Sequence, residues 1–359
     1  MPRSDDRPKT RLILPIQYLR GIAALMVVWF HTVGQIPVVA TFFPSTFGNS
    51  GVDLFFVISG FIMVVTTAGT DVSALEFFRR RVVRVVPLYW LLTLAMVVTA
   101  IAMPSLFRTL IVAPKTLLES LFFIPHFSAS FPSKAWPLLV PGWTLNFEMF
   151  FYLVFALSLL LPARAQLRAF IATFALLIGA GMAFGPFESA PAQVYTDPIM
   201  LEFVAGALLA QLWLHDRHHA PRWLSVVAIA AGAALLACRN SAPLGYFNQM
   251  VGASLVVFGS LHTAFGASRN SVLKALGDSS YSLYLTHLFT LGVLRVVWSR
   301  AFAAPTTELA AAAFVATGLV VCSGVGYLAY RWIETPLLAR LKHVGQARGQ
   351  ARQLRNGAQ

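Results

Sequence analysis

The sequence contains little charge and little cysteine. Charged side chains make up 11% of the 359 residues, whereas soluble domains average about 25%. The two cysteines, Cys238 and Cys322, both fall within apolar runs, so the sequence gives no disulfide framework and no pattern of metal ligands. No repeat or polar catalytic domain interrupts the apolar runs. We therefore expect a protein without a metal, whose chemistry takes place in the membrane.

Apolar residues dominate the composition of the chain. They account for 57% of the chain, and the mean hydropathy is +0.70. A helix that crosses a bilayer needs about 20 consecutive, mostly apolar residues. The composition therefore predicts an all-α, polytopic membrane protein with about ten transmembrane helices. We expect these helices near residues 12–34, 51–69, 85–103, 142–162, 168–186, 198–214, 223–238, 246–264, 279–298 and 309–331.

The basic residues set the expected orientation. A net charge of +13 can indicate nucleic-acid binding, but here the arginines lie between apolar spans, which the positive-inside rule explains better. With the N-terminus in the cytoplasm, Lys and Arg number 20 in the inner segments and 6 in the outer ones. We expect a bacterial plasma (inner) membrane protein with both termini cytoplasmic and no nucleic-acid partner. The first apolar run is too long for a signal-peptide core, so we expect it to be retained.

Two segments outside the spans stand out. The longest outer segment, 104–141, is rich in proline and contains a short apolar piece, 117–124. We expect it to form a re-entrant or interfacial loop that covers a site. The polar, basic tail 338–359 is expected to be disordered or to lie on anionic lipid headgroups. The remainder, residues 1–337, is expected to form one transmembrane domain.

The first span carries an arginine and a histidine. An ionisable side chain at membrane depth costs about 2.5 kcal/mol or more on insertion scales, so each is a functional candidate. Arg20 and His31 are eleven residues apart, close to three helical turns, so they share one face about 16 Å apart along the axis. We interpret this stripe as one wall of a reaction channel.

Two carboxylates are expected at a depth similar to that of His31. Asp53 enters the second span from its outer end, and Glu148 lies about two turns into the fourth. A carboxylate beside a neutral imidazole suits general-base catalysis, because it fixes the tautomer and stabilises the imidazolium. Each could instead be a packed polar residue that a neighbour satisfies, but we favour the functional interpretation for Asp53 and Glu148 and the structural one for Glu202.

Four arginines precede the third span, in EFFRRRVVRVVPLYW. Such a cluster can bind phosphates through charge-assisted hydrogen bonds, or it can simply fix the orientation of the span. Orientation does not require Arg20 inside the bilayer, so we favour a phosphorylated cytoplasmic donor. The candidate donor-binding residues are Arg20, Arg79, Arg80, Arg81 and Arg84.

Three further ionisable residues have motifs of their own. His287, near the middle of the ninth span, is either a second proton-handling group or a packing histidine. Glu334, in RWIETPL, is expected to pair with a cation at the inner face. His126, in the outer loop, is expected to be solvated, although it could touch an acceptor.

Six segments in chain order together resemble one family. They are IQYLRGIAALMVVWFH, GVDLFFVISGFIM, FFRRRVVRVVPLYW, PGWTLNFEMFFY, LGDSSYSLYLTHL and RWIETPL. From about residue 14 to 337, the chain resembles the membrane-bound acyltransferase 3 family. It is most similar to exopolysaccharide O-acetyltransferases that lack an appended soluble domain. In two-domain relatives a soluble hydrolase-like module follows the last span, so here the membrane part has to complete the transfer or pass the group to a separate protein.

The resemblance implies ten spans, with acetyl-coenzyme A (acetyl-CoA) as co-substrate and a sugar hydroxyl outside the cytoplasm as acceptor. It also implies functional roles for Arg20, His31, Arg81, Arg84 and Glu148. We expect membrane lipid, a polysaccharide or lipid-linked glycan and polysaccharide assembly proteins as partners. The candidate catalytic residues are His31, Glu148 and Asp53, and the candidate substrate-binding residues are Trp143, Asn146 and His287. Trp143 either stacks on a sugar ring or anchors a helix end.

Two other functions remain open from the sequence. Intramembrane Asp, Glu and His residues also relay protons in transporters, although the chain shows no clear inverted repeat of the kind many carriers have. A non-catalytic subunit of a polysaccharide-export assembly is the second alternative.

Overall fold

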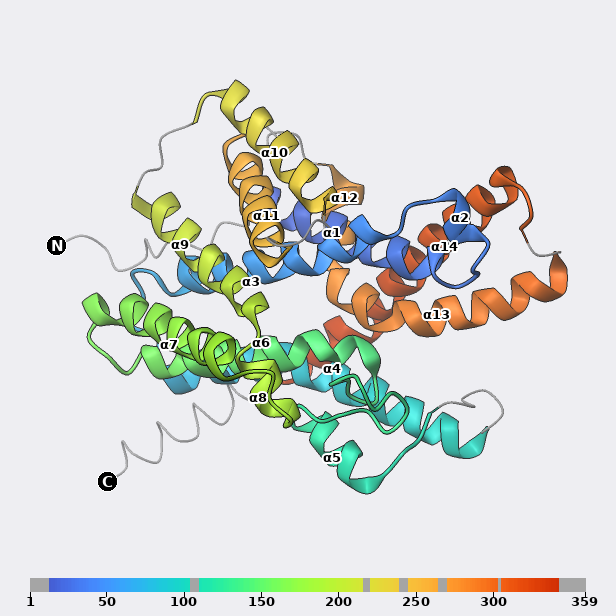
Figure 1. Cartoon of the computed structure of the whole chain (residues 1–359), viewed down its shortest axis with the longest axis horizontal. Coiled ribbons are helices and arrows are strands. Elements are labelled where there is room, and N and C mark those ends of the chain that lie inside the picture. The colour runs from blue at the N-terminus through green and yellow to red at the C-terminus, as the bar shows by residue number, and fades with distance from the viewer. Residues whose placement is uncertain are drawn as a thin grey trace. The chain divides into compact units, whose positions relative to one another are not determined.

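The computed structural model describes residues 13–103, 110–215, 220–238, 245–263, 270–302 and 305–341. These residues are mainly helical, and no strand occurs among them (Figure 1). The prediction of an all-α fold is therefore confirmed for the part of the chain that the structure describes.

Each of the ten predicted ranges contains a helix. These helices are α1 (Leu14–Val33), α3 (Ser50–Thr67), α4 (Ala74–Ala102), α6 (Trp143–Ser158), α7 (Ala163–Phe184), α9 (Leu201–His215), α10 (Arg222–Ala237), α11 (Gly245–His262), α13 (Ser280–Ala301) and α14 (Glu308–Ala329). Shorter elements lie between them: α2 (Val39–Phe42), η1 (Thr46–Asn49), α5 (Pro114–Leu121), η3 (Val140–Gly142), α8 (Ala190–Tyr195), η4 (Pro198–Met200) and α12 (Ser271–Asp278). The π-helix η6 (Tyr330–Glu334) follows α14.

Seven helical stretches of the described chain are long and apolar enough to cross a membrane. They contain α1, α3, α4, α6, α7, α9 and α14. Of the other three predicted spans, α10 is a shorter apolar helix, and α11 and α13 are not among the seven. The chain is thus a membrane protein with several spans, whereas the number ten and the cytoplasmic position of the termini stay predictions.

Helix α4 begins earlier than the predicted span. Its N-cap is Ser73, whose hydroxyl accepts a hydrogen bond from the backbone N–H of Glu76 at 3.2 Å, as in a capping sequence. The helix has 29 residues and is about 44 Å long, more than the hydrocarbon core of about 30 Å. All four arginines therefore lie in its first turns, before the apolar part.

The chain folds into two compact units. Unit 1 comprises Met1–Asp71, Leu201–Ser280 and Ala303–Leu319, and unit 2 comprises Val72–Met200, Tyr281–Phe302 and Val320–Gln359. The predicted tail 338–359 is described only to residue 341, where it is helical. The rest of the tail and the basic residues before residue 13 lie outside the described residues.

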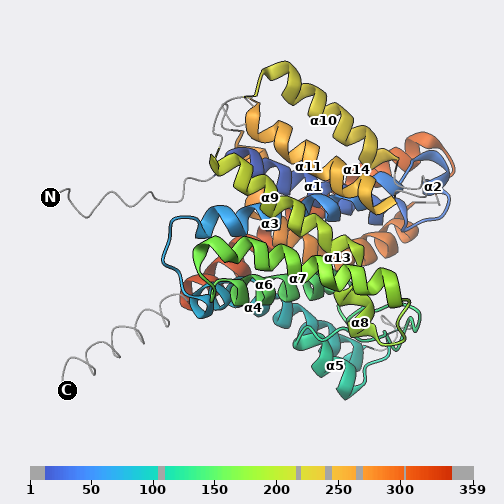
Figure 2. The ribbon, with the colours of Figure 1, turned by 60° about the vertical axis from the view of Figure 1, so that its left-hand side comes forward.

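In unit 1, α1 packs against α3, α11 and α12, and α10 lies along α11 (Figures 1 and 2). Helices α3 and α9 approach each other closely. A Cβ at Gly60 would meet the backbone oxygen of Phe203, and one at Gly206 would meet that of Val57. Such small residues let helix backbones approach closely in membranes.

In unit 2, α6 packs against α4, α7 and α8. Aromatic rings fill the space between α6 and α7: Phe151 and Phe155 of α6 lie 5.5 and 5.6 Å from Phe170 of α7, measured between ring centroids. The loop between α4 and α6 docks on α4. Trp90 donates its indole N–H to the backbone oxygen of Leu121 at 2.7 Å.

Candidate active site

Helix α1 holds Arg20 and His31 as the sequence predicted. The helix is unbroken from Leu14 to Val33, so the two residues keep their separation of three turns on one face. Both side chains are half-buried. The imidazole of His31 lies edge-on to Phe30, with 4.9 Å between ring centroids.

Arg20 is held by residues that the sequence analysis did not single out. Its guanidinium donates to Ser280 Oγ at 2.9 Å and to Gln17 Oε1 at 3.4 Å. Gln17 in turn donates to Asp278 Oδ1 at 2.6 Å, and Lys274 pairs with the other oxygen of that carboxylate at 2.5 Å. The end of α12 therefore fixes the arginine of α1.

Two carboxylates are buried in unit 1. Asp53 lies in the first turn of α3 and Glu202 in the first turn of α9, and each residue is 1% exposed. A helix N-terminus stabilises a nearby negative charge, which lowers the cost of burying each group. Burial alone does not separate the catalytic interpretation of Asp53 from the structural interpretation of Glu202.

In unit 2 the four arginines of α4 divide into an outward pair and an inward pair. Arg79 and Arg80 are exposed, and their Nε atoms lie 2.9 and 2.8 Å from the carboxylate of Glu76. Arg81 turns inward, with its guanidinium carbon 5.3 Å from the centre of the Phe77 ring. The four side chains therefore do not point at one place.

Arg84 is the second member of the inward pair. Its Nη1 lies 2.5 Å from Glu334 Oε1, which confirms that Glu334 pairs with a cation. Glu334 is 1% exposed, belongs to the π-helix η6 and accepts a second hydrogen bond, from Ser282 Oγ at 2.5 Å. Single π-turns are rare and frequently occur at functional sites. Here η6 brings the carboxylate to α4 and α13.

Glu148 of α6 lies near Arg81, one of the inward pair. Its carboxylate accepts a hydrogen bond from the hydroxyl of Tyr152 and interacts electrostatically with Arg81. The guanidinium of Arg81 also lies 6.0 Å from the centre of the Tyr152 ring. The structure defines these contacts within unit 2, while His31 and Asp53 belong to unit 1, so the common depth of the three groups stays a prediction.

The predicted substrate-binding residues differ in their surroundings. Trp143 is half-buried at the start of α6, edge-on to Phe147. Asn146 is 2% exposed, and its Oδ1 has no hydrogen-bond partner among the described residues. An unsatisfied buried acceptor costs about 1–3 kcal/mol, which makes Asn146 a better candidate than its place in the sequence suggests. His287 is 1% exposed, and its Nδ1 lies 2.6 Å from the backbone oxygen of Tyr284.

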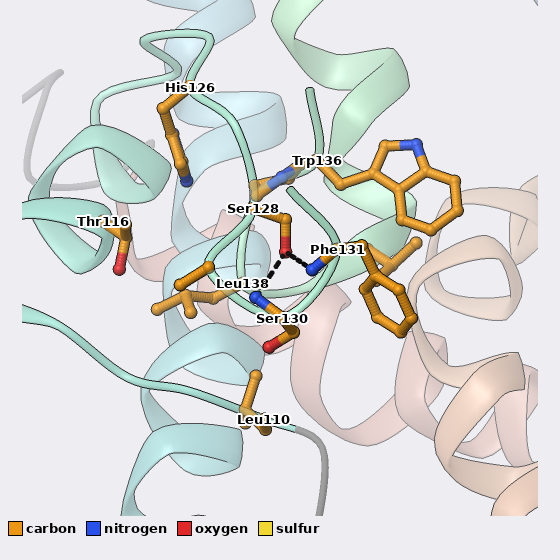
Figure 3. Close-up of a pocket in the computed structure, with 11 residues that line it drawn as sticks. Leu110, Thr116, His126, Ser128, Ser130, Phe131, Trp136 and Leu138 are labelled. Carbon is orange, nitrogen blue, oxygen red and sulfur yellow. Dashed lines mark hydrogen bonds between the residues drawn. The ribbon is translucent and has the colours of Figure 1, made fainter. Parts of the chain in front are cut away.

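The expectation that His126 is solvated is wrong, because the side chain is only 7% exposed. The chain reverses direction at the end of α5 in a Schellman motif: Ile124 N–H donates to the oxygen of Glu119 at 2.9 Å, and Phe123 N–H to that of Ser120 at 3.3 Å. This turn folds His126 back under the loop, where its Nδ1 lies 2.9 Å from the oxygen of Ile124. The imidazole lines a pocket there (Figure 3).

Apolar helices that carry buried carboxylates and half-buried arginines in both units define an integral membrane protein with polar sites inside its helices. The sequence of residues 14–328 matches the acyltransferase domain of the acyltransferase 3 family. The chain belongs to this family of membrane-bound acyltransferases and is an acyltransferase, so the predicted family and enzyme class are confirmed.

Individual relatives are similar over most of the chain. The exopolysaccharide production protein ExoZ of Rhizobium meliloti is 41% identical over 82% of this chain and 91% of its own length. The acyltransferase MdmB of Streptomyces mycarofaciens is 26% identical over 84% of this chain and 85% of its own length. The putative peptidoglycan O-acetyltransferase YrhL of Bacillus subtilis is 26% identical over 91% of this chain but 55% of its own length. No solved structure matches the chain.

Proposed function

We propose that the protein is an O-acetyltransferase of the bacterial plasma membrane. It moves an acetyl group from cytoplasmic acetyl-CoA to a hydroxyl of an extracytoplasmic or lipid-linked polysaccharide. The observation that carries this proposal is α1, an unbroken apolar helix with Arg20 and His31 on one face. The similarity to a protein of exopolysaccharide production supports a glycan as the acceptor.

The donor is assigned to the arginines. Coenzyme A carries phosphates, and arginine binds phosphate through paired, charge-assisted hydrogen bonds. Arg81 and Arg84 are the main donor-binding residues of unit 2, because they turn inward into a network that fixes them. Arg20 is the donor-binding arginine of unit 1. Arg79 and Arg80 contribute through their charge, since their side chains point outward and pair with Glu76.

The imidazole of His31 is assigned as the general base. It takes the proton of the acceptor hydroxyl while the hydroxyl oxygen attacks the thioester carbon. The new C–O bond replaces the C–S bond, and the departing thiolate of coenzyme A receives the proton. A transient acetyl-histidine gives the same balance in two steps, and both routes remain within the proposal. Asp53 and Glu148 are assigned to orient or charge-balance the imidazole.

The acceptor is assigned to residues near the start of α6. The buried amide oxygen of Asn146 can accept a hydrogen bond from a sugar hydroxyl, and the half-buried ring of Trp143 offers an aromatic face. His287 is assigned here with less structural support, because its Nδ1 already bonds within its own helix. In the proposed orientation in the membrane, both termini lie in the cytoplasm and the loop after α4 lies outside.

The test is mass analysis of surface polysaccharide from cells that carry the wild-type protein, His31→Ala or a matched control, His262→Ala. His262 is also a half-buried histidine near a helix end, with Nδ1 2.8 Å from the backbone oxygen of Phe258. His31→Ala is expected to abolish acetylation at normal protein level, while the control retains it. Acetylation that persists in His31→Ala would remove the imidazole from the mechanism. Wild-type polysaccharide that carries no acetyl group would refute the function.

A further inference from the structure

Two residue pairs, one on α4 and one on α6, meet where these helices pack in unit 2. Phe77 and Arg81 are four residues apart on α4, and Glu148 and Tyr152 are four residues apart on α6. Residues at this spacing are neighbours on one helix face. The two faces meet, because the rings of Phe77 and Tyr152 lie nearly edge-on with centroids 6.4 Å apart. The four side chains form one group, which we call the α4–α6 cluster.

Both rings of the α4–α6 cluster border the guanidinium of Arg81. Its central carbon lies 5.3 Å from the centre of the Phe77 ring and 6.0 Å from that of the Tyr152 ring. A cation at about 6 Å or less from a ring centre is attracted by the electron-rich face of the ring. Phe77 and Tyr152 are 2% and 4% exposed, so water competes little for these contacts. The rings therefore limit the positions that the arginine can adopt.

The hydroxyl of Tyr152 joins its ring to the carboxylate of the cluster. It donates a hydrogen bond to Glu148 Oε1, and both Glu148 and Tyr152 interact electrostatically with Arg81. Glu148 is only half-buried, so without this bond its side chain would have several rotamers open to it. Tyr152 therefore fixes two groups at once, the carboxylate through its hydroxyl and the guanidinium through its ring.

The orientation of Arg81 matters for binding a phosphate. An arginine side chain is long and loses rotamer freedom when it binds an anion, unless its neighbours already hold it. The planar guanidinium binds phosphate best through two parallel N–H groups, a geometry that depends on how the plane is turned. Arg81 is half-buried, so part of it stays accessible to a ligand while the rest is held. Tyr152 is thus placed to control how well this arginine receives an anion.

We propose that Tyr152 is a positioning residue for the acyl donor. It holds the Arg81 guanidinium and the Glu148 carboxylate in the arrangement that receives a phosphate of coenzyme A, and it acts through Arg81 rather than by contact with the donor. The proposal rests on the proposed function for the identity of the donor. It adds Tyr152 to the residues that set donor affinity, and it gives Glu148 a second role, at the donor-binding arginine as well as at the imidazole.

The test is a double-mutant cycle on the binding of coenzyme A. The full-length protein in lipid nanodiscs is titrated with coenzyme A as wild type, Tyr152→Phe, Arg81→Ala and the double variant. Tyr152→Phe keeps the ring and removes the hydroxyl, and it is expected to raise the Kd about fivefold, within the range for one lost hydrogen bond. In the Arg81→Ala background the same change is expected to alter the Kd less than about twofold, because Tyr152 acts through the arginine.

Initial rates separate positioning from a general loss of structure. In Tyr152→Phe the KM for acetyl-CoA should rise several-fold, while the kcat at saturating donor stays within about twofold of wild type. The matched control is Tyr195→Phe, which also removes one hydroxyl from unit 2. Tyr195 is half-buried on α8, and its ring stacks on Phe150 of α6 with centroids 4.1 Å apart. The control should leave both the Kd and the KM within about twofold of wild type.

The outcomes distinguish this proposal from the proposed function. An unchanged Kd in Tyr152→Phe, or a Kd raised equally with and without Arg81, overturns the positioning role and leaves the proposed function standing. A lower kcat with an unchanged KM overturns the positioning role in the same way. A coupled effect on coenzyme A binding, in a protein that transfers no acetyl group to polysaccharide, would refute the proposed function and leave the positioning role standing. No binding of coenzyme A by the wild type overturns both.

Discussion

Two faces of α4 carry two arginines each, within one run of six residues. On the outward face, Arg79 and Arg80 share the carboxylate of Glu76 and are exposed. On the inward face, Arg81 lies against Phe77 and Tyr152, and Arg84 pairs with Glu334. The outward pair can set orientation at the membrane surface, whereas the inward pair is fixed among residues of α6, α13 and η6.

This difference refines the interpretation of a basic cluster. An exposed ion pair contributes about 0–1 kcal/mol and is screened by salt. A partly buried arginine that a carboxylate already holds in place loses little conformational entropy when it binds a phosphate. More of the interaction energy therefore appears as affinity. The comparison therefore predicts that the inward arginines dominate affinity for the donor.

The largest effect is expected from Arg81→Ala. Removing a charge-assisted contact costs about 1.5–3 kcal/mol, which corresponds to roughly a 10- to 100-fold rise in the KM for acetyl-CoA. The kcat at saturating donor should change much less. Initial rates with purified protein in nanodiscs measure both constants. Arg168→Ala is the matched control, because Arg168 is exposed on α7 and its Nε donates to the backbone oxygen of Arg164 in its own helix.

An equal rise in KM for Arg168→Ala would mean that net charge, and not the position of Arg81, governs donor binding. A change in membrane orientation without a change in KM would leave the cluster with a topological role alone. Reporter fusions at the C-terminus distinguish this second outcome.

An intermediate effect is expected from Glu334→Gln. The change leaves the guanidinium of Arg84 without its charged partner in a site where Glu334 is 1% exposed. Because the Arg84 side chain is 35% exposed, solvent reduces the loss of stability to about 1–2 kcal/mol. We expect a lower melting temperature and a several-fold higher KM for acetyl-CoA. Glu308→Gln, at an exposed position in the first turn of α14, is the control.

A double variant separates stability from donor binding. Arg84→Met with Glu334→Leu leaves no unpaired charge, and such replacements of buried pairs are often neutral or stabilising. The melting temperature should therefore recover while the KM stays high. If the melting temperature and the KM both return to the wild-type values, Arg84 has a purely structural role. Arg81 is then the donor-binding arginine of the inward face.

The sequence was sufficient for the helices but not for the contacts between distant residues. Apolar runs located the helices because membrane spans depend on length and composition. The early start of α4 was readable from Ser73 and Glu76, a capping signature that the apolar criterion passes over. The sequence predicted that Glu334 pairs with a cation. It did not predict that the cation is Arg84, which lies 250 residues away in the chain.

Two features of the site could not be predicted from local sequence. His126 is buried just after a turn in which Phe123 adopts a left-handed conformation, and a phenylalanine gives no signal for that conformation. Arg20 is fixed by Asp278 through Gln17, a chain of contacts that only packing of α1 on α12 brings about. In both cases a tertiary contact decides the role of a residue that local sequence leaves open.

The smallest effect is expected from Arg79→Ala combined with Arg80→Ala. The two side chains point away from the inward pair, so they act on a bound donor through the solvent, where charges separated by more than about 8 Å are screened at physiological salt. The double variant should raise the KM for acetyl-CoA less than about threefold, and this difference should vanish at high ionic strength. A salt-independent rise as large as that of Arg81→Ala would show that all four arginines act as one phosphate clamp. The outward and inward directions of the arginine side chains would then be a property of the protein without bound donor.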